Sequence, residues 1–339
     1  MYVLSLLTID LLADTWDVIG NVTFSQPLGY LNKGCDFDNT IKTSKTAMRY
    51  FSLVAQSPWL DYLFDKNPVC RIGPPSFGEI TKFSIQKLTD RLEKRGANRC
   101  LEKSDFLDKF IEAKKKYPET VDDTQIISYL MNNMIAGADT TAITLTAILY
   151  FSLKNREVWK RLQDEIPVQP STSRIFSYSD IKSFSYLGAV VNESMRLHPA
   201  AAMPLERYVS ETGLTLPNGQ YAPPGCIIGM DPYTIGRNQS VWRDPEVFLP
   251  ERWLPDAHEL ENHYQERFQS MKNFVLTFGA GSRTCIGKNL AHVEMLKVVA
   301  TLVSRFDITL VRPDDDWTTH NSFFLYQDGV RVAFCPRQE

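Results

Sequence analysis

The chain has 339 residues, of which 43% are hydrophobic, and its 37 basic and 40 acidic side chains leave a net charge of −3. A chain of this length can bury one large core, and this near balance of charge gives no reason to expect nucleic acid as a partner. We therefore predict a single domain over residues 1–339.

The cysteine pattern and the first residues bear on location. Six cysteines are scattered without a zinc-site spacing, which predicts free thiols in a reducing, intracellular compartment. The apolar start is interrupted at Asp10 and carries no basic segment, so we predict neither a membrane anchor nor a signal peptide. The six are Cys35, Cys70, Cys100, Cys226, Cys285 and Cys335.

The first part of the chain is dominated by helical patterns. Apolar residues recur at helical spacing over 2–19, with Gly20 suited to the end of that helix. The segments 41–56 and 76–95 have the same pattern, and the proline-rich stretch 57–75 between them predicts an irregular connection.

A long apolar helix is predicted next. Asp122, Asp123 and Thr124 make a favourable helix start, and no proline follows before residue 153. Such a helix would be roughly 45 Å long and would cross the middle of the domain. Its weak point is the sequence Ala-Gly-Ala-Asp-Thr-Thr over 136–141.

The second part changes from helices to strands. Asn218-Gly219 is a hairpin signal within an alternating stretch, and the last thirty residues read as strands and turns. Helices followed by a small β-rich part predict a mainly α, α+β domain. The expected order is helices at 155–165 and 179–198, strands at 207–229, a glycine-rich loop at 274–284, a helix at 286–304 and strands at 306–335.

The glycine-rich loop carries the most specific chemistry. It reads Phe278-Gly279-Ala280-Gly281-Ser282-Arg283-Thr284-Cys285-Ile286-Gly287. Two glycines allow a tight backbone close to a flat ligand, and a following helix start would stabilise a thiolate at Cys285. A thiolate is the axial ligand that a haem iron needs to break an O–O bond, and Arg283 could pair with a haem propionate. The alternative is a buried structural cysteine.

The pattern F-x-x-G-x-R-x-C-x-G resembles the haem-binding loop of the cytochrome P-450 monooxygenases. Three other segments follow that family's order, and the sequence around them resembles that of filamentous-fungal enzymes of the pisatin demethylase type. They are Ala136-Gly137-Ala138-Asp139-Thr140-Thr141 (oxygen-binding signature), Glu193-Ser194-Met195-Arg196 (E-x-x-R pair) and Pro250-Glu251-Arg252-Trp253 (P-E-R-F element).

The resemblance implies the cytochrome P-450 fold and its haem-thiolate chemistry. The reaction would insert one atom of O2 into an apolar small molecule, here in fungal secondary metabolism. The cofactor would be haem b, with Cys285 as the iron ligand. The remaining cofactor contacts implied are Arg283, Arg207, Phe278, Gly279, Gly281 and Gly287.

Two polar groups in the motifs have physical content of their own. Glu193 and Arg196 are three residues apart and share a helix face, and Arg252 can complete a buried ion network that locks this helix to the Cys285 loop. The alternative is an ordinary surface ion pair.

Asp139 and Thr140 interrupt the long apolar helix just after Gly137. A threonine hydroxyl at a local bulge can hold water beside dioxygen, and a neighbouring acid can relay protons, which is the role that the resemblance implies for this pair. The alternative is a polar patch bonded to its own backbone.

Residues facing a substrate are implied only by analogy with the family, and each could equally belong to the core. They are Asn133, Met134, Ala138, Ala201, Met203, Phe323 and Phe324.

Electrons would come from a partner. The sequence has no G-x-G-x-x-G unit for a nucleotide, so the resemblance implies NADPH-cytochrome P-450 reductase as the donor of two electrons. Family members are anchored to the cytoplasmic face of the endoplasmic reticulum.

The chain departs from the family in two places. The long helix begins much earlier than in a full member, so the resemblance covers about the C-terminal two thirds of the fold, without the part that supplies one side of the haem pocket. Gly236-Arg237-Asn238 stands where many relatives have His-Arg-Asp. Two alternatives stay open: a truncated, non-catalytic fragment, and a haem-dependent isomerase or dehydratase, against which the Asp139-Thr140 pair argues.

Overall fold

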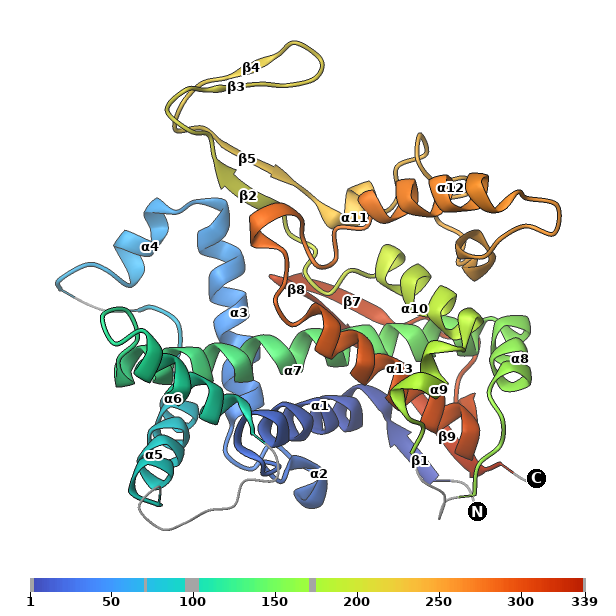
Figure 1. The fold of residues 1–339 in the computed structure, drawn as a ribbon, viewed down its shortest axis with the longest axis horizontal. Coiled ribbons are helices and arrows are strands. Elements are labelled where there is room, and N and C mark those ends of the chain that lie inside the picture. Colours follow the sequence, from blue (N-terminus) through green and yellow to red (C-terminus); the bar gives the residue numbers. More distant parts are fainter. Residues whose placement is uncertain (1–2, 70–71, 95–103, 171–174, 338–339) are drawn as a thin grey trace. The chain divides into compact units, whose positions relative to one another are not determined.

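The computed structural model describes residues 3–69, 72–94, 104–170 and 175–337 (Figure 1). Cys70 and Cys100 therefore lie outside the described residues. The chain forms two compact units, which we describe separately. The N-terminal unit comprises residues 3–146 and 310–333, and the C-terminal unit comprises residues 147–309 and 334–337. Helix α7 (Asp123–Lys154) and strand β9 (Arg331–Pro336) run through both.

The N-terminal unit is built from helices and one small antiparallel sheet. Strands β7 and β8 pair from Thr318 opposite Asp328 to Ser322 opposite Phe324, and Phe323 makes the turn between them with a φ of 70°. The elements that lie wholly in this unit are β1 (Val3–Leu6), α1 (Leu7–Phe24), α2 (Tyr30–Lys33), α3 (Thr40–Gln56), α4 (Trp59–Phe64), α5 (Gly78–Lys94), α6 (Phe106–Lys116), β7 (Thr318–Ser322) and β8 (Phe324–Asp328).

Helix α1 lies close to α7 in this unit. A Cβ atom at Gly137 would be 2.8 Å from Cδ1 of Ile19, so the absence of a side chain at residue 137 lets the two helices approach. Trp16 from α1 is fully buried, as are Leu130 and Ala138 from α7. The glycine of the oxygen-binding signature thus serves helix packing in this chain.

The long central helix is confirmed almost residue for residue, and α3 matches the predicted 41–56. The prediction at the N-terminus is wrong at both ends: residues 3–6 form a strand, and α1 continues past Gly20 to Phe24, ending where Ser25 adopts a left-handed conformation with a φ of 58°. Helices α4 and α6 were not predicted. Residues 57–75 are therefore not wholly irregular, because α4 interrupts them.

The C-terminal unit carries the remaining helices and two antiparallel strand pairs. The β2–β5 pair continues into the narrow β3–β4 hairpin, whose turn contains Asn218 and Gly219 as predicted (Figure 1). The elements are α8 (Arg156–Glu165), α9 (Tyr178–Lys182), α10 (Ser185–Leu197), β2 (Leu205–Tyr208), β3 (Leu214–Thr215), β4 (Tyr221–Ala222), β5 (Ile227–Met230), α11 (Pro232–Ile235), η1 (Pro250–Trp253), α12 (Glu261–Asn273), η2 (Gly281–Arg283), α13 (Lys288–Arg305) and β6 (Phe306–Leu310).

The predicted helix 179–198 is broken into α9 and α10. The carboxylate of Glu165, at the end of α8, accepts hydrogen bonds from the backbone N–H groups of Tyr186 (2.7 Å) and Leu187 (2.8 Å). These N–H groups belong to the first turn of α10, where they have no partner within the helix. A side chain distant in sequence therefore starts a new helix where the local pattern predicted a continuous one.

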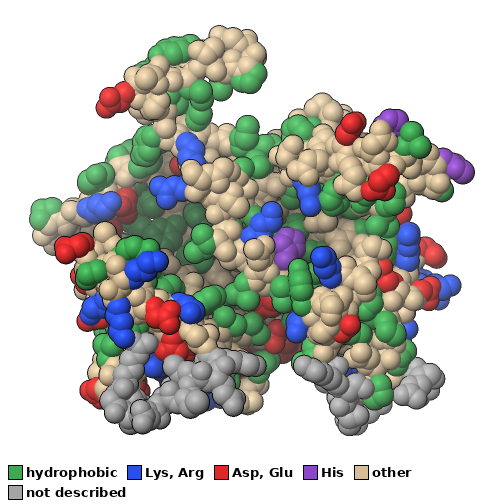
Figure 2. Space-filling view, viewed as in Figure 1, with side chains coloured by type: hydrophobic (Ala, Val, Ile, Leu, Met, Phe, Trp, Pro, Cys, Tyr) green, Lys and Arg blue, Asp and Glu red, His purple; other side chains and the backbone are tan. Residues whose placement is uncertain are grey.

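The balance of elements confirms the mainly helical α+β class. Among the described helices, α7 is the one long and apolar enough to cross a membrane, but 72% of its most apolar window is buried inside the protein. Burial of this kind is typical of a core helix. On the face shown in Figure 2, acidic and basic side chains are interspersed with hydrophobic ones.

Candidate functional site

The Cys285 loop folds as the glycine pattern predicts. Gly279 and Gly281 have φ values of 66° and 65°, a region that side-chain-bearing residues rarely adopt. These two turns bring the backbone N–H of Cys285 to 2.8 Å from the carbonyl oxygen of Phe278, where it donates a hydrogen bond. The loop thereby presents the thiol of Cys285 at an exposed position. The alternative of a buried structural cysteine is wrong for this structure.

The helix after the loop begins later than predicted. Helix α13 starts at Lys288 with Gly287 at its N-cap, so Cys285 precedes the cap by two residues and lies outside the first helical turn. A Cβ atom at Gly287 would lie 3.8 Å from Sγ of Cys285. A larger residue at 287 would therefore extend beside the sulfur and narrow the approach to it.

The surroundings of Cys285 suit a flat ligand with an apolar face and an anionic edge. The side chain of Ile286 is 99% exposed, which leaves an apolar surface that a planar hydrophobic group can cover. Arg283 and Arg207 are both exposed, and within the described residues neither forms an ion pair with a carboxylate. Among the residues that the structure describes, the Arg207 side chain, on β2, donates only to the backbone carbonyl of Glu206.

The donor set at Cys285 also indicates what kind of metal group could bind. Within the described residues no three His, Cys, Asp or Glu side chains gather as a metal site. An iron held by this single thiolate must therefore bring its other ligands with it, as a porphyrin does. The exposed thiol, the apolar Ile286 and the exposed Arg283 two residues before Cys285 fit haem.

Behind the loop, Arg196 and Glu193 form a fully buried network. The five N–H donors of the Arg196 guanidinium all have acceptors: both carboxylate oxygens of Glu193 (2.7 and 2.9 Å) and three backbone carbonyls. Both side chains have an exposed fraction of 0%. The carbonyls belong to Gly236, Pro245 and Val247.

The carboxylate of Glu193 has further donors on the segment that contains η1. Nε of Arg252 donates at 2.9 Å and Nε1 of Trp253 at 2.8 Å, while the backbone N–H of Leu249 donates at 3.0 Å. The predicted Glu193–Arg196–Arg252 grouping is thus present in the structure, and the surface ion pair is not. The indole of Trp253 completes this network, a contact that was not predicted from the sequence.

The departure at Gly236 has a steric reason. A Cβ atom at residue 236 would lie 2.4 Å from the backbone oxygen of Arg196, so only glycine fits there. A hydrogen bond that the sequence did not indicate ties the residue before the Cys285 loop to α10. The hydroxyl of Thr277 donates to the carbonyl of Met195 at 3.0 Å. The close approach of Gly236 and the hydrogen bond of Thr277 thus hold two separate segments against α10.

Asp139, in the N-terminal unit, lies in a different environment from the one predicted. Its side chain is completely buried and accepts hydrogen bonds from Nε1 of Trp16 (3.2 Å), Oγ of Ser44 (2.8 Å) and the hydroxyl of Tyr326 (3.1 Å). These partners come from α1, α3 and β8, between 95 and 187 residues away in sequence. No local pattern could have indicated them.

Thr140 does not sit at a bulge. Helix α7 is continuous through 136–141, and the hydroxyls of Thr140 and Thr141 donate to the carbonyl oxygens of Ala136 (2.8 Å) and Gly137 (3.0 Å). Threonine hydroxyls commonly bond in this way to the carbonyl four residues earlier. The predicted break in the helical ladder is therefore wrong, although Thr140 itself is only half-buried.

Burial raises the pKa of Asp139, and this effect outweighs the three hydrogen bonds that lower it. A folded pKa above the ordinary value of 3.8 means that the folded chain binds more protons than the unfolded chain between those two pH values. We expect the wild type to lose stability relative to Asp139→Asn as the pH rises from about 3.8 through the raised pKa. Urea unfolding of both proteins across that range checks this; parallel curves would contradict it.

The residues predicted to face a substrate lie in both units. Met134 and Ala138 are buried in α7, with exposed fractions of 1% and 0%, and Phe324 is buried in β8. The remaining ones, Asn133, Ala201, Met203 and Phe323, are half-buried. The amide nitrogen of Asn133 is buried and has no hydrogen-bond partner within the described residues.

The sequence is similar to that of known proteins. The chain is 43% identical over 324 residues to the cytochrome P-450 monooxygenase cfoH of Aspergillus candidus, which covers 95% of this chain and 60% of the relative. It is 34% identical to the monooxygenase cicH of Emericella nidulans, again over 95% of this chain and over 63% of the relative. Identity to the monooxygenase vrtE of Penicillium aethiopicum is 32%, over 95% of this chain and 64% of the relative.

The chain spans between 60% and 64% of the length of these three relatives. The family model for cytochrome P-450 matches residues 7–334, which includes the Cys285 loop, the Glu193–Arg196 network and the α7 signature. Nearly the whole chain is therefore accounted for by one family: this protein belongs to the cytochrome P-450 family.

Proposed function

We propose that this chain is the catalytic part of a haem-thiolate monooxygenase that inserts one oxygen atom into an apolar small molecule, in fungal secondary metabolism. The observation that carries the proposal is the Cys285 loop, with its exposed thiol and the two positive φ values at Gly279 and Gly281. The similarity of the chain to named monooxygenases of Aspergillus and Penicillium supports the reaction class.

Residues 1–339 act as one catalytic domain in this proposal. Haem bound through Cys285 supplies dioxygen activation, in which one oxygen atom enters the substrate and the other becomes water. Arg283 and Arg207 pair with the propionates, and Phe278 packs beside the sulfur. The Glu193–Arg196 network holds α10 rigid beneath the loop, so the thiol keeps its position.

Asp139 and Thr140 handle protons in this proposal. The two closest partners of Asp139 are the hydroxyls of Ser44 and Tyr326, at 2.8 and 3.1 Å. A hydroxyl can accept a proton from a neutral carboxylic acid as well as donate one. Asp139 passes protons through these contacts, and the half-buried Thr140 hydroxyl holds water.

The substrate is apolar and carries at least one hydrogen-bond acceptor. The unpartnered amide nitrogen of Asn133 supports this, because a buried donor without a partner costs free energy that a ligand acceptor would recover. Half-buried apolar side chains supply apolar surface in each unit, Phe323 in the N-terminal unit and Ala201 and Met203 in the C-terminal unit, whereas Met134, Ala138 and Phe324 are buried. Two electrons come from NADPH through a cytochrome P-450 reductase in an intracellular compartment, which the exposed free thiols of Cys35 and Cys226 support.

The test of this function is haem uptake followed by a spectrum. The purified chain is incubated with haemin, reduced, and exposed to carbon monoxide. We expect the red-shifted Soret band that distinguishes thiolate-bound haem from haem bound through nitrogen. A chain that folds, as judged by circular dichroism, yet shows an ordinary haem spectrum would contradict the assignment of Cys285.

A further inference from the structure

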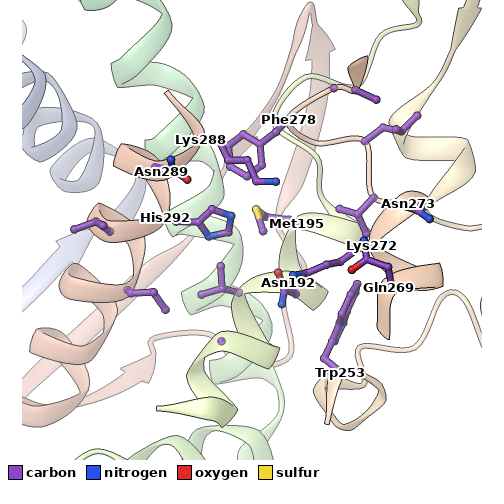
Figure 3. Close-up of a pocket in the computed structure, with 18 of the residues that line it drawn as sticks. Asn192, Met195, Trp253, Gln269, Lys272, Asn273, Phe278, Lys288, Asn289 and His292 are labelled. Atoms are coloured by element: carbon purple, nitrogen blue, oxygen red, sulfur yellow. The ribbon is translucent and has the colours of Figure 1, made fainter. Parts of the chain in front are cut away.

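The C-terminal unit contains an open cavity of about 1120 Å³ (Figure 3). Its walls come from α10, α12, α13 and the start of the Cys285 loop. Cys285, Arg283 and Arg207 do not line it. The cavity is large enough for a small organic molecule, since ligand sites typically measure about 300–1,000 Å³.

The charge in this cavity has one sign. Lys272, Lys288 and His292 line it, and no aspartate or glutamate does. Figure 3 shows the three side chains directed into the same space around Met195. In the part of the chain that the structure describes, none of the three forms an ion pair or a side-chain hydrogen bond with an acid.

The three basic groups are close enough to repel each other. The pKa of His292 is lowered by burial and then by the charges of Lys288 and Lys272. The pKa of Lys272 is lowered by burial and by Lys288. No carboxylate lines the cavity to offset this repulsion, so a bound anion would stabilise the protonated form of each of the three groups.

The base of the cavity is apolar. Phe278, Val293 and Leu296 line it and are half-buried, so they keep accessible apolar surface, while Met195 and Trp253 are almost completely buried. The ring of Phe278 packs against the imidazole of His292 at 5.1 Å between centroids. A ligand that matches both features has an apolar or aromatic body and a negatively charged end.

We propose that this cavity binds an organic anion whose apolar body lies on Phe278, Val293 and Leu296 and whose carboxylate lies among Lys272, Lys288 and His292. Phe278 and Gly279 of the Cys285 loop line this cavity but Cys285 does not, and anion binding is measured on the chain without haem, so its outcome is distinct from that of the haem spectrum. Charge and shape act together here: the lysines select the anion and the apolar base selects its body.

The test compares two ligands of the same shape. Isothermal titration of the purified chain with 2-naphthoate and with the neutral 2-naphthylmethanol measures the contribution of the charge. We expect the acid to bind about tenfold more tightly, the size expected of one charge-assisted contact. The double variant Lys272→Gln/Lys288→Gln should lose this preference, while Lys160→Gln, an exposed lysine of α8 outside the cavity, should keep it.

A second variant tests the position of the apolar body. A Cβ atom at Gly188, in the wall formed by α10, would meet no atom within 4 Å, so Gly188→Leu directs a side chain into the cavity without a clash. It should weaken binding of both ligands. The proposal is overturned if the wild type shows no preference for the acid, if the double variant retains that preference, or if Gly188→Leu binds both ligands as the wild type does. Circular dichroism confirms that each variant is folded.

Discussion

Replacing Cys285 with serine is expected to abolish the red-shifted Soret band of the reduced, carbon monoxide-treated protein and with it all haem-dependent oxygenation. A hydroxyl does not donate charge to iron as a thiolate does. Removing a group that only hydrogen-bonds to a metal ligand typically costs about 10–100-fold in metal affinity or activity. Removing the ligand atom itself should therefore lower haem-dependent activity by more than ~100-fold. Spectra and turnover with a reductase measure both effects.

The chain offers a matched control for this substitution. Cys226 is also an exposed free thiol of the C-terminal unit, and it lies in the strand region after the β3–β4 hairpin. Cys226→Ser should leave the spectrum and the turnover unchanged. Persistence of both pigment and turnover in Cys285→Ser would remove the basis of the proposed function, whatever the control does.

Replacing Glu193 with alanine is expected to lower the free energy of unfolding of the chain by about 3–5 kcal/mol. The substitution leaves the Arg196 guanidinium buried with two of its donors unsatisfied, and it removes the acceptor of Arg252 and of the Trp253 indole. Removing one partner of a buried ion pair typically costs about 3–5 kcal/mol. That is a large fraction of the total stability of a domain, which is about 5–15 kcal/mol. Urea unfolding gives the difference.

An exposed glutamate in the same unit provides the comparison. Glu246 pairs with Arg237 at 3.1 Å, but its side chain is 71% exposed. Pairs of this kind contribute about 0–1 kcal/mol, so Glu246→Gln should have little effect. Equal losses in the two variants would mean that burial of the network contributes nothing beyond an ordinary ion pair.

Local pattern was sufficient where structure depends on neighbours in sequence. Helices α3 and α7 follow from their apolar spacing, and the hairpin at Asn218-Gly219 from its turn residues. The loop around Cys285 also follows, because the positive φ values at Gly279 and Gly281 need glycine whatever surrounds them. The residue types at that spacing therefore determined both the family and the candidate iron ligand.

Long-range contacts decided what the sequence alone could not. The break between α9 and α10 depends on the carboxylate of Glu165, and the burial of Asp139 depends on Trp16, Ser44 and Tyr326. Each such contact joins segments that are distant in sequence, and its free energy is absent from any local window. The cavity with the basic lining likewise exists only because α12 and α13 place Lys272, Lys288 and His292 around one space.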